Sequence, residues 1–308
     1  MVERIHLAIL KAIDEHGTLT EAASALCLTQ SALSHSIKKL EQQLNIRLWN
    51  KEGRNLRFTQ AGQYLLNISH QLLPQLVHAE EILQQYAIGK RGSLRIGMEC
   101  HPCYKWLLRV VSPFLEAWPD VDIDVRQQFQ FGGLDALRHH EIDLLITPDP
   151  VHDSDLTFQP IFDYELVLVV ANNHPLATKE VIAAEQLSSE VLITYPVATE
   201  RLDIYSQFLL PNNSSPKQHI TVETTDIMLH LVAAGRGVTA LPAWLVDQYN
   251  KELPISAIRL GEKGIHKQIF VGRRNQDSGI DYLSSFIELA HRKTPTCSKA
   301  IVRASFCP

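Results

Sequence analysis

The chain has 308 residues, of which 45% are hydrophobic and 20% are charged, and its formal net charge is −5. These values are typical of a globular protein with two or three domains, each large enough to bury its own core. No apolar run approaches the roughly 20 residues of a membrane-spanning helix, and the first residues lack the apolar stretch of a signal peptide. Five cysteines with no paired framework predict reduced thiols, so we expect a cytoplasmic protein that makes no contact with a membrane.

The first segment with a functional pattern is a predicted pair of short helices. We expect a helix over residues 20–26 with small side chains on its packed side, a break at residues 27–29, and a second helix over residues 30–44. The second helix carries one predicted buried stripe, made of Leu33, Ile37, Leu40 and Leu44. Two short helices joined by such a turn are typical of the helix-turn-helix, whose second helix enters the major groove of DNA.

The outward side of the second predicted helix carries short polar or cationic groups that suit DNA. These candidate DNA-binding residues are Thr29, Gln30, Ser31, Ser34, His35 and Lys38. Hydroxyl groups bond to phosphates, and a glutamine can pair with adenine through two hydrogen bonds. The alternative is that the Ser, Thr and Gln at the start of the helix serve only as a helix cap.

Cationic residues are concentrated around this helix. Residues 29–58 include six basic and two acidic residues, a local charge of +4 within a chain of net charge −5. Residues 52–55 have the composition of a hairpin turn between two short strands. We therefore predict a wing that carries Arg54 and Arg57 toward the sugar–phosphate backbone.

The pattern from about Leu7 to Gly62 resembles the winged-helix domain of LysR-type transcriptional regulators. The resemblance runs through LT-AA--L--TQSALS--I--LE--L---L to the R-L-FT--G ending. The chain departs from the family pattern at Asn45, where the family prefers Gly, at Trp49, where Phe is usual, and at Lys51, where Arg is common. Asn tolerates the left-handed backbone that a Gly would supply. The resemblance implies a homo-oligomer, dimer or tetramer, that binds an inverted-repeat operator.

A long helix is predicted after Gly62, extending to about Ala87, with Pro74 inside it. Its apolar seam consists of Leu65, Ile68, Leu72, Gln75, Ala79 and Ile82. One interpretation is that this helix packs on its own domain. In LysR-type proteins the corresponding helix links the two domains and pairs with its twin, which implies that the dimer contacts are Leu65, Ile68, Leu72 and Ile82.

Strand and helix patterns alternate beyond a Gly- and basic-rich boundary at residues 89–93. We expect strands at 94–98, 121–127, 142–147, 166–171, 191–195, 220–222, 238–241 and 267–271, and helices at 106–118, 134–139, 203–210, 226–234 and 282–291. Such alternation predicts parallel sheets with crossover helices. Two α/β lobes with a returning chain also resemble the periplasmic-binding-protein-like sensor of the LysR family.

The predicted fold is therefore an N-terminal winged helix-turn-helix, a long linker helix and a two-lobed α/β sensor, an α + α/β chain. We expect a DNA-binding domain at 1–62, a linker and dimerisation helix at 63–88, an effector-binding domain at 89–294 and an unstructured tail at 295–308. Within the sensor, lobe I is expected at about 92–164 and 266–294, and lobe II at about 165–265. Ligands of such folds bind at the carboxyl ends of strands, in the crevice between lobes.

The segment from Glu99 to Cys103 follows the first predicted sensor strand and begins a helix, where free backbone N–H groups can hold a carboxylate. Three interpretations compete for this segment. It can cap and line a small-molecule pocket, which we favour. It can hold a metal, although consecutive residues cannot all face one ion. It can supply a redox-active or nucleophilic cysteine, activated by His101 and the helix start.

Several segments also resemble the branch of the LysR family that regulates methionine-pathway genes and responds to homocysteine. They are MECHPCYKWL, DLLITPD, FDYELVLVVANNHPLA, LITYPV---RLDIY and ALPAW. The resemblance implies an effector site among Glu99, Cys100, His101, Cys103, Thr147, Tyr195, Arg201, Thr224 and Thr225. The helix start at Cys103, or Arg201, would hold the ligand carboxylate and Glu99 the ammonium. Arg201 could equally form a surface ion pair.

We therefore expect a DNA-binding regulator with a sulfur amino-acid effector, without catalytic residues, cofactor or bound metal, and with RNA polymerase as a candidate partner. A second hypothesis keeps the DNA-binding role and gives the sensor another effector, a carboxylate metabolite or a metal ion. A third, from another class, is an enzyme or redox sensor that uses Cys100 or Cys103 with His101. The sequence argues against an enzyme, because no third group is evident to orient the base.

Overall fold

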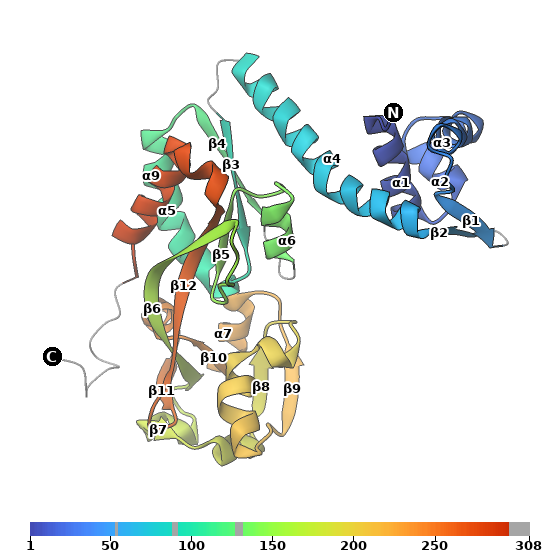
Figure 1. The fold of residues 1–308 in the computed structure, drawn as a ribbon. Coiled ribbons are helices and arrows are strands. Elements are labelled where there is room, and N and C mark those ends of the chain that lie inside the picture. Colours follow the sequence, from blue (N-terminus) through green and yellow to red (C-terminus); the bar gives the residue numbers. More distant parts are fainter. Residues whose placement is uncertain (53–54, 88–91, 127–131, 296–308) are drawn as a thin grey trace. The chain divides into compact units, whose positions relative to one another are not determined.

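The computed structural model of the chain describes residues 1–52, 55–87, 92–126 and 132–295 (Figure 1). It separates into two compact units. The first contains residues 1–93 with 134–142, and the second contains residues 94–133 with the chain from 143 onward. Among the described residues, no helix is long and apolar enough to cross a membrane.

The first unit is a helical domain with a two-stranded hairpin. Its elements are α1 (Arg4–His16), α2 (Leu19–Ala25), α3 (Gln30–Leu44), β1 (Trp49–Glu52), β2 (Asn55–Phe58) and α4 (Gln60–Ala87), together with α6 (Gly133–Arg138). Thr18 and Thr29 begin α2 and α3, since each side chain accepts a hydrogen bond from a backbone N–H three residues later. Asn45 ends α3 in the left-handed conformation, with φ of 52°, as its replacement of glycine predicts. The predicted helix-turn-helix is therefore confirmed.

The core of the first unit joins α1, α2 and α3 to the hairpin. Its buried apolar side chains are Ile9, Leu10, Ala12, Ile13, Ala22, Ala23, Leu33, Ile37, Leu40, Leu48 and Leu66. The predicted stripe on α3 is confirmed at its first three positions but is wrong at Leu44, which is 41% exposed. Leu44 is the last residue of α3, and the left-handed turn at Asn45 follows it directly. The side chain therefore lies beyond the core.

The long helix α4 runs through Pro74 without ending there. Leu66, Ser69 and Leu73 are buried on the side of α4 that packs on its own unit, with α1 as its main neighbour. The residues predicted as a dimer seam are less buried: Leu65, Ile68 and Ile82 are half-buried, and Leu72 is exposed. Leu65 packs against the core of its own unit. One side of α4 packs within its own unit, as the first interpretation expects. Leu72 is exposed, as the dimer interpretation expects.

Gly62 marks a close approach between α4 and the hairpin. A Cβ at this position would meet the backbone oxygen of Leu48 at 1.9 Å. Thr59 reinforces the junction, since its hydroxyl donates to the backbone oxygen of Arg47 at 2.6 Å and accepts from the N–H of Gly62 at 3.1 Å. The FT--G ending of the sequence motif is therefore the joint between wing and long helix.

The second unit contains one ten-stranded sheet. Its strands are β3 (Gly92–Met98), β4 (Val121–Arg126), β5 (Leu144–Thr147), β6 (Leu156–Ala171), β7 (Val181–Ile182), β8 (Val191–Thr194), β9 (Gln218–Thr221), β10 (Val238–Pro242), β11 (Ile255–Leu260) and β12 (Ile265–Arg274). The main path runs β4-β3-β5-β12-β6-β10-β8-β9, and β11 pairs with both β6 and β7. We call the end with β3, β4 and β5 lobe I and the end with β7–β10 lobe II. The long strands β6 and β12 join the two ends (Figure 1).

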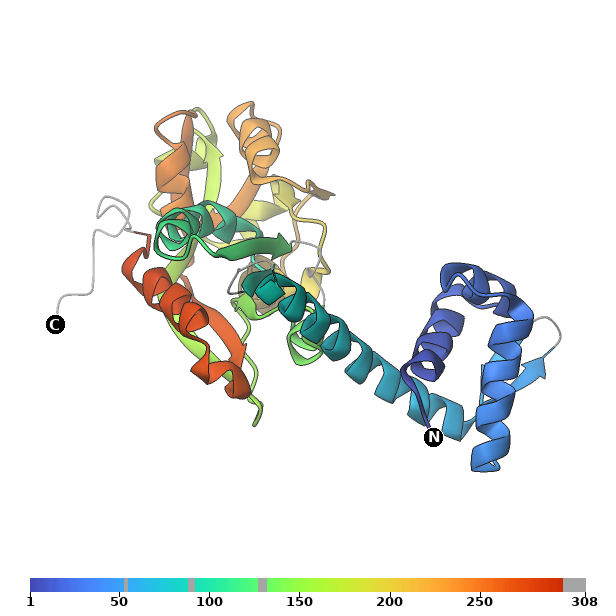
Figure 2. The same ribbon diagram turned by 90° about the horizontal axis from the view of Figure 1, so that it is seen from above.

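Helices cover both ends of this sheet. They are α5 (Tyr104–Ala117) and α9 (Asp281–Arg292) in lobe I, and α7 (Thr225–Ala233) and α8 (Ala243–Tyr249) after β9 and β10. Short helices are η1 (His101–Cys103), η2 (Pro175–Thr178), η3 (Ala184–Ser189), η4 (Thr199–Arg201), η5 (Ile204–Leu209), η6 (Leu210–Asn212) and η7 (Asn275–Gly279). Helices α5 and α9 lie side by side (Figure 2), with the rings of Phe114 and Phe286 5.4 Å apart between them.

The prediction of purely parallel sheets is wrong at the centre of the molecule. β3 with β5, and β8 with β9 and β10, are parallel as expected. The two joining strands are antiparallel to each other, and β6 is also antiparallel to β10 and β11. The predicted strand at 166–171 is only the second half of β6, because Gln159 and Pro160 break the apolar run before it. α1, α8, β7 and β11 were not predicted.

A buried network of charges holds lobe I together. The carboxylate of Asp143 accepts hydrogen bonds from Arg95 at 2.9 and 3.1 Å and from Arg274 at 3.1 Å. Arg274 also donates to Asp277 at 2.6 Å, and all four residues are buried. Burial alone would raise the pKa of the Asp143 carboxyl, but the hydrogen bonds and charge of Arg95, together with Arg274, hold it below its ordinary value.

Candidate functional site

The outer side of α3 carries the residues predicted to contact DNA. Gln30, Ser31, His35 and Lys38 are exposed, and Ser34 is half-buried. Thr29 is exposed as well, but its hydroxyl already accepts from the N–H of Ala32 at 3.2 Å and lies 3.1 Å from the hydroxyl of Ser31. Thr29 therefore caps α3, while the other five polar side chains belong to the helix itself.

The wing is tied to the base of α3 by a buried acidic side chain. Glu41 accepts a hydrogen bond from the N–H of Leu48 at 2.7 Å and has only 8% of its surface exposed. Arg57 is exposed on β2, opposite Asn50 of β1, and Arg54 lies outside the described residues. The sequence reasoning counted Glu41 only as a negative charge. Its position one residue after Leu40, at the edge of the buried stripe, was the signal for a structural role.

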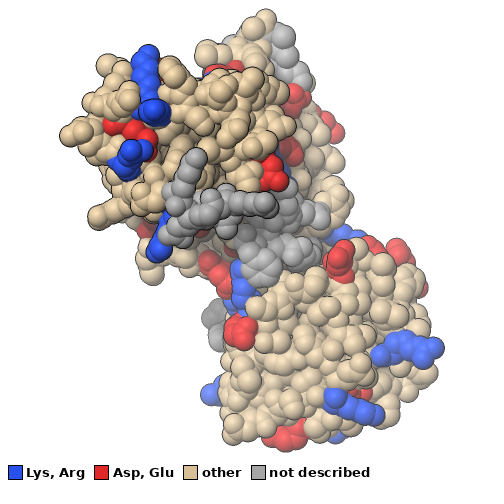
Figure 3. Space-filling view, turned by 90° about the vertical axis from the view of Figure 1, so that its right-hand side faces the viewer, with Lys and Arg blue, Asp and Glu red and all other residues tan. Residues whose placement is uncertain are grey.

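Charged side chains of both signs are scattered singly over the face shown in Figure 3, among many uncharged ones.

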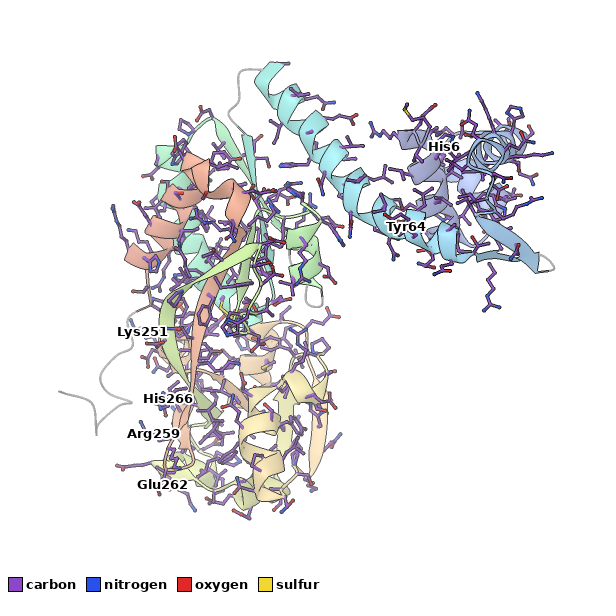
Figure 4. The ribbon with its side chains drawn as sticks, in the orientation of Figure 1. His6, Tyr64, Lys251, Arg259, Glu262 and His266 are labelled. Carbon is purple, nitrogen blue, oxygen red and sulfur yellow. A yellow bond between two sulfur atoms is a disulfide. The ribbon has the colours of Figure 1, made fainter. Side chains whose placement is uncertain are left out.

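An apolar groove lies beside α3 and the start of α4. Its lining includes Val2, Leu44, Ile46 and Tyr64. Tyr64, labelled in Figure 4, is 69% exposed. These side chains add to the exposed apolar surface of α4 around Leu72.

One cavity of the second unit lies where the two lobes meet. It brings together four of the predicted effector residues, which are Glu99, Cys100, Tyr195 and Arg201. Its remaining lining includes Pro102, Pro148, Asp149, Tyr164, Leu166, Thr194, Val197, Leu202, Asp203, Ile204, Thr239, Ala240 and Pro242. Strand ends contribute on both sides, Glu99 after β3 and Asp149 after β5 in lobe I, and Tyr195 after β8 in lobe II. A crevice at strand ends is the expected place for a ligand.

Glu99 is fixed on the lobe I wall by two donors. The hydroxyl of Thr147 donates to it at 2.7 Å and the N–H of Gly133 at 3.2 Å. Gly133 is required by the close packing, since a Cβ there would lie 2.6 Å from Leu145 and 2.9 Å from the Glu99 carboxylate. Thr147 is fully buried and does not line the cavity. Its predicted role is therefore indirect, because it orients Glu99.

An ion-pair bridge joins two of the acidic residues that line the cavity, one from each lobe. Lys267 of β12 lies 2.8 Å from Asp149 of lobe I and 3.3 Å from Asp203 of lobe II. Burial alone would lower the pKa of Lys267, but the two carboxylates outweigh it and raise the pKa above its ordinary value. Burial, then the charges of Asp203 and Asp149, also raise the pKa of the nearby Tyr164 hydroxyl.

None of these four residues, Asp149, Tyr164, Asp203 and Lys267, was predicted from the sequence as part of the site. Asp149 directly follows the TP pair after a predicted strand, so the strand-end rule could have found it. Lys267 lies in the middle of a strand pattern, and nothing in the sequence pairs it with a carboxylate 118 residues earlier.

Two further predicted effector residues, Thr224 and Thr225, lie around a second cavity. Thr224 and Thr225 line it with Met98, Tyr104, Glu223 and Asp226. Tyr195 approaches it from the first cavity, since its hydroxyl lies 2.7 Å from that of Thr225. Cys100 lines both cavities. Residues that were predicted to form one effector site therefore line two adjacent cavities, and Cys100 lines both.

Cys100 and Cys103 are joined by a disulfide. The expectation of reduced thiols is wrong for this pair, because a helical turn over η1 brings the two Cα atoms to 5.5 Å, within bonding reach. Cys103 is fully buried and lines neither cavity. The side chain of His101 lies outside the described part of the structure. Within the described part, no group of three or more His, Cys, Asp or Glu residues forms a metal-binding cluster.

A winged helix-turn-helix followed by a two-lobed ligand-binding domain defines a class of bacterial transcriptional regulators. The model of the bacterial regulatory helix-turn-helix protein of the lysR family matches residues 5–63, and that of the LysR substrate binding domain matches residues 87–295. The chain belongs to the LysR family.

Among its relatives, the transcriptional regulator MetR of Escherichia coli K12 is 38% identical over 290 residues, which cover 94% of this chain and 90% of MetR. The solved regulatory domain of MetR from Neisseria meningitidis is 35% identical with a TM-score of 0.61, covering 66% of this chain and 93% of that domain. Full-length CbnR in complex with its target DNA is 19% identical over 95% of this chain and all of that one, with a TM-score of 0.66, which shows a shared fold. The chain is therefore a MetR-like, LysR-type transcriptional regulator and not an enzyme.

Proposed function

We propose that this regulator acts in the cytoplasm on methionine-biosynthesis genes and binds an inverted-repeat operator as a homo-oligomer. In this proposal residues 1–62 bind DNA, residues 63–88 hold the dimer, and residues 89–294 bind the effector, with RNA polymerase as a candidate partner. The exposed polar side of α3 supports the first role. The exposed apolar side of α4 at Leu72 supports the second.

The effector in this proposal is homocysteine, bound in the cavity between the lobes. The observation that carries the assignment is the charge pattern of the cavity, where Arg201 lies with Glu99, Asp149 and Asp203. An amino acid has one carboxylate and one ammonium group. Arg201 would hold the carboxylate, because a guanidinium matches its two oxygens. Glu99 would hold the ammonium, while Asp149 and Asp203, which pair with Lys267, add negative charge to the same cavity. The names of the MetR relatives support a ligand of the methionine pathway.

Binding in this cavity would act on DNA through the relative positions of the two lobes. A ligand that contacts both lobes favours the conformation in which both contacts form. If the effector alters the affinity for DNA in this way, DNA must alter the affinity for the effector by the same factor.

Thermal unfolding of the full-length protein with a panel of ligands tests the proposal. At 100 times its dissociation constant homocysteine should stabilise the sensor by about 2.7 kcal/mol. Methionine, which keeps the carboxylate and ammonium but lacks the thiol, should stabilise it less. Arg201→Ala should abolish the shift, whereas Arg236→Ala, an exposed arginine that lines neither cavity, should leave it intact. Stabilisation by unrelated dicarboxylates, with none from homocysteine, would rule out this effector.

A further inference from the structure

The Cys100–Cys103 disulfide offers its two sulfur atoms unequally to a ligand. Cys100 lines both cavities at the junction of the lobes, with 6% of its surface exposed. Cys103 is 1% exposed and lines neither of them. A thiol held in the cavity between the lobes therefore meets the sulfur of Cys100 and is shielded from that of Cys103.

Cys103 lies at a helix start, where a leaving thiolate gains some stabilisation. It is the N-cap residue of α5, a helix of 14 residues. A helix start carries partial positive charge, which stabilises a thiolate formed there, while burial of Cys103 in the apolar core opposes it. The direction of attack is therefore set by access, since Cys100 lines the cavities and Cys103 does not.

We propose that the sensor captures a thiol-containing amino acid covalently by thiol–disulfide exchange at Cys100. The ligand thiolate attacks the sulfur of Cys100, a new ligand–Cys100 disulfide forms, the Cys100–Cys103 bond breaks, and its electron pair leaves on Cys103 as a thiolate. In the reverse step Cys103 attacks the sulfur of Cys100 and expels the ligand as its thiolate. The cycle consumes no oxidant or reductant. This inference rests on the proposed thiol effector.

The charged groups of the cavity give the exchange its selectivity. A free thiol in solution reacts with a disulfide only on encounter, whereas a bound one is held beside the sulfur at a high effective concentration. Arg201 and the acidic residues that line the same cavity would hold the two charged groups of an amino acid. A thiol without these groups would reach Cys100 without being held there.

A trapping experiment with the full-length protein tests the inference. Cys27 is exposed and unpaired, and Cys297 and Cys307 complete the five cysteines, so these three are first changed to Ser. In this background Cys103→Ser removes the residue that resolves the mixed disulfide. The reduced variant is incubated with homocystine, the disulfide of homocysteine, and analysed by intact mass without reductant. The Cys100 thiolate should take up one homocysteine and release the other.

Three comparisons make the result specific. Labelling by homocystine should be about tenfold faster than labelling by cystamine, whose two halves lack the carboxylate, at equal concentration. Cys100→Ser, which leaves Cys103 as the remaining cysteine, should not be labelled in the folded state. The background protein with its disulfide intact, treated with homocysteine and an alkylating agent, should carry homocysteine on Cys100 and the alkyl group on Cys103.

The outcomes separate this inference from the effector assignment. If the double variant Cys100→Ser, Cys103→Ser is stabilised by homocysteine in a thermal melt and no variant is labelled, exchange is overturned and the effector stands. If homocysteine neither stabilises nor labels any form, both fail. Equal labelling by homocystine and cystamine, or labelling on Cys103 in place of Cys100, also overturns the inference.

Discussion

The outer side of α3 and the cavity between the lobes are built in opposite ways. On α3 the polar side chains all come from one helix, between Gln30 and Lys38. They are separate from the apolar core beneath them. The cavity takes its charged groups from Glu99, Asp149 and Asp203, which lie on different segments and are held by ion pairs and hydrogen bonds. Substitutions on α3 should therefore alter function alone, whereas substitutions around the cavity should alter function and stability together.

The largest effect is expected from the buried charge network of lobe I. Asp143→Ala should lower the free energy of unfolding of the sensor by about 3–5 kcal/mol, because it leaves Arg95 and Arg274 buried without their shared carboxylate. Glu288→Ala is the matched control, since the Glu288–Arg292 pair on α9 is mostly exposed and should change stability by less than about 0.5 kcal/mol. Urea unfolding followed by circular dichroism would measure both. Equal effects would mean that the buried network does not hold lobe I.

The same network predicts how sensor stability depends on pH. The pKa of Asp143 is lower in the folded protein than in the unfolded chain, so its ionised form stabilises the fold. This contribution is fully present above the unfolded value of about 3.9 and is lost as the pH falls through the folded pKa. Unfolding of the wild type should therefore become easier as the pH falls below about 4. An Asp143→Asn variant, less stable at neutral pH, should show a shallower loss over that window.

Substitutions at two neighbouring leucines of α4 would distinguish packing within the first unit from dimerisation. Leu73 is buried within its own unit and Leu72 is 43% exposed. Leu73→Asp should destabilise the first unit, because it places a charge at a buried position. Leu72→Asp should leave that unit folded, yield smaller particles in sedimentation and weaken operator binding, since each half-site would be bound singly. A folded, fully dimeric Leu72→Asp variant would contradict the proposed seam.

A smaller effect is expected at the bridge between the lobes. Lys267→Met should destabilise the sensor by about 1–2 kcal/mol, because Asp149 and Asp203 lose the cation between them. The loss should be smaller than for Asp143, since half of the Asp149 side chain is exposed and is screened by water. Lys217→Met, at an exposed position of the same unit, should change stability little. Chemical unfolding of both variants would measure these changes in the free energy of unfolding.

The smallest change is expected on the wing. Arg57→Ala should leave stability unchanged and weaken binding to all DNA sequences about equally, because an exposed arginine on β2 suits a phosphate contact. The slope of log affinity against log salt should fall by about one unit. Fluorescence anisotropy with operator and random DNA at several salt concentrations measures both quantities. A changed sequence preference with an unchanged slope would assign Arg57 to base contacts instead.

The sequence predicted local features well and distant pairings poorly. The bounds of α3, its cap at Thr29 and the left-handed Asn45 depend on residues a few positions apart, so their pattern is visible in the chain. The antiparallel joining strands, the Lys267 bridge and the network around Asp143 depend on which strands become neighbours, which periodicity does not specify. The disulfide was missed for another reason: the spacing of Cys100 and Cys103 fits both a free pair at a helix start and a bonded one.

The position of β12 has a consequence for synthesis of the chain. This strand lies between β5 and β6 in the sheet, and it brings Arg274 to Asp143 from 131 residues later in the sequence. At about 5–20 residues per second, on the order of 10 s pass on the ribosome between the two. During that interval β5 has an unpaired edge, while the strands of lobe II are complete by Pro242. The first unit is almost finished long before, so a nascent chain can fold its helix-turn-helix while its sensor is still open.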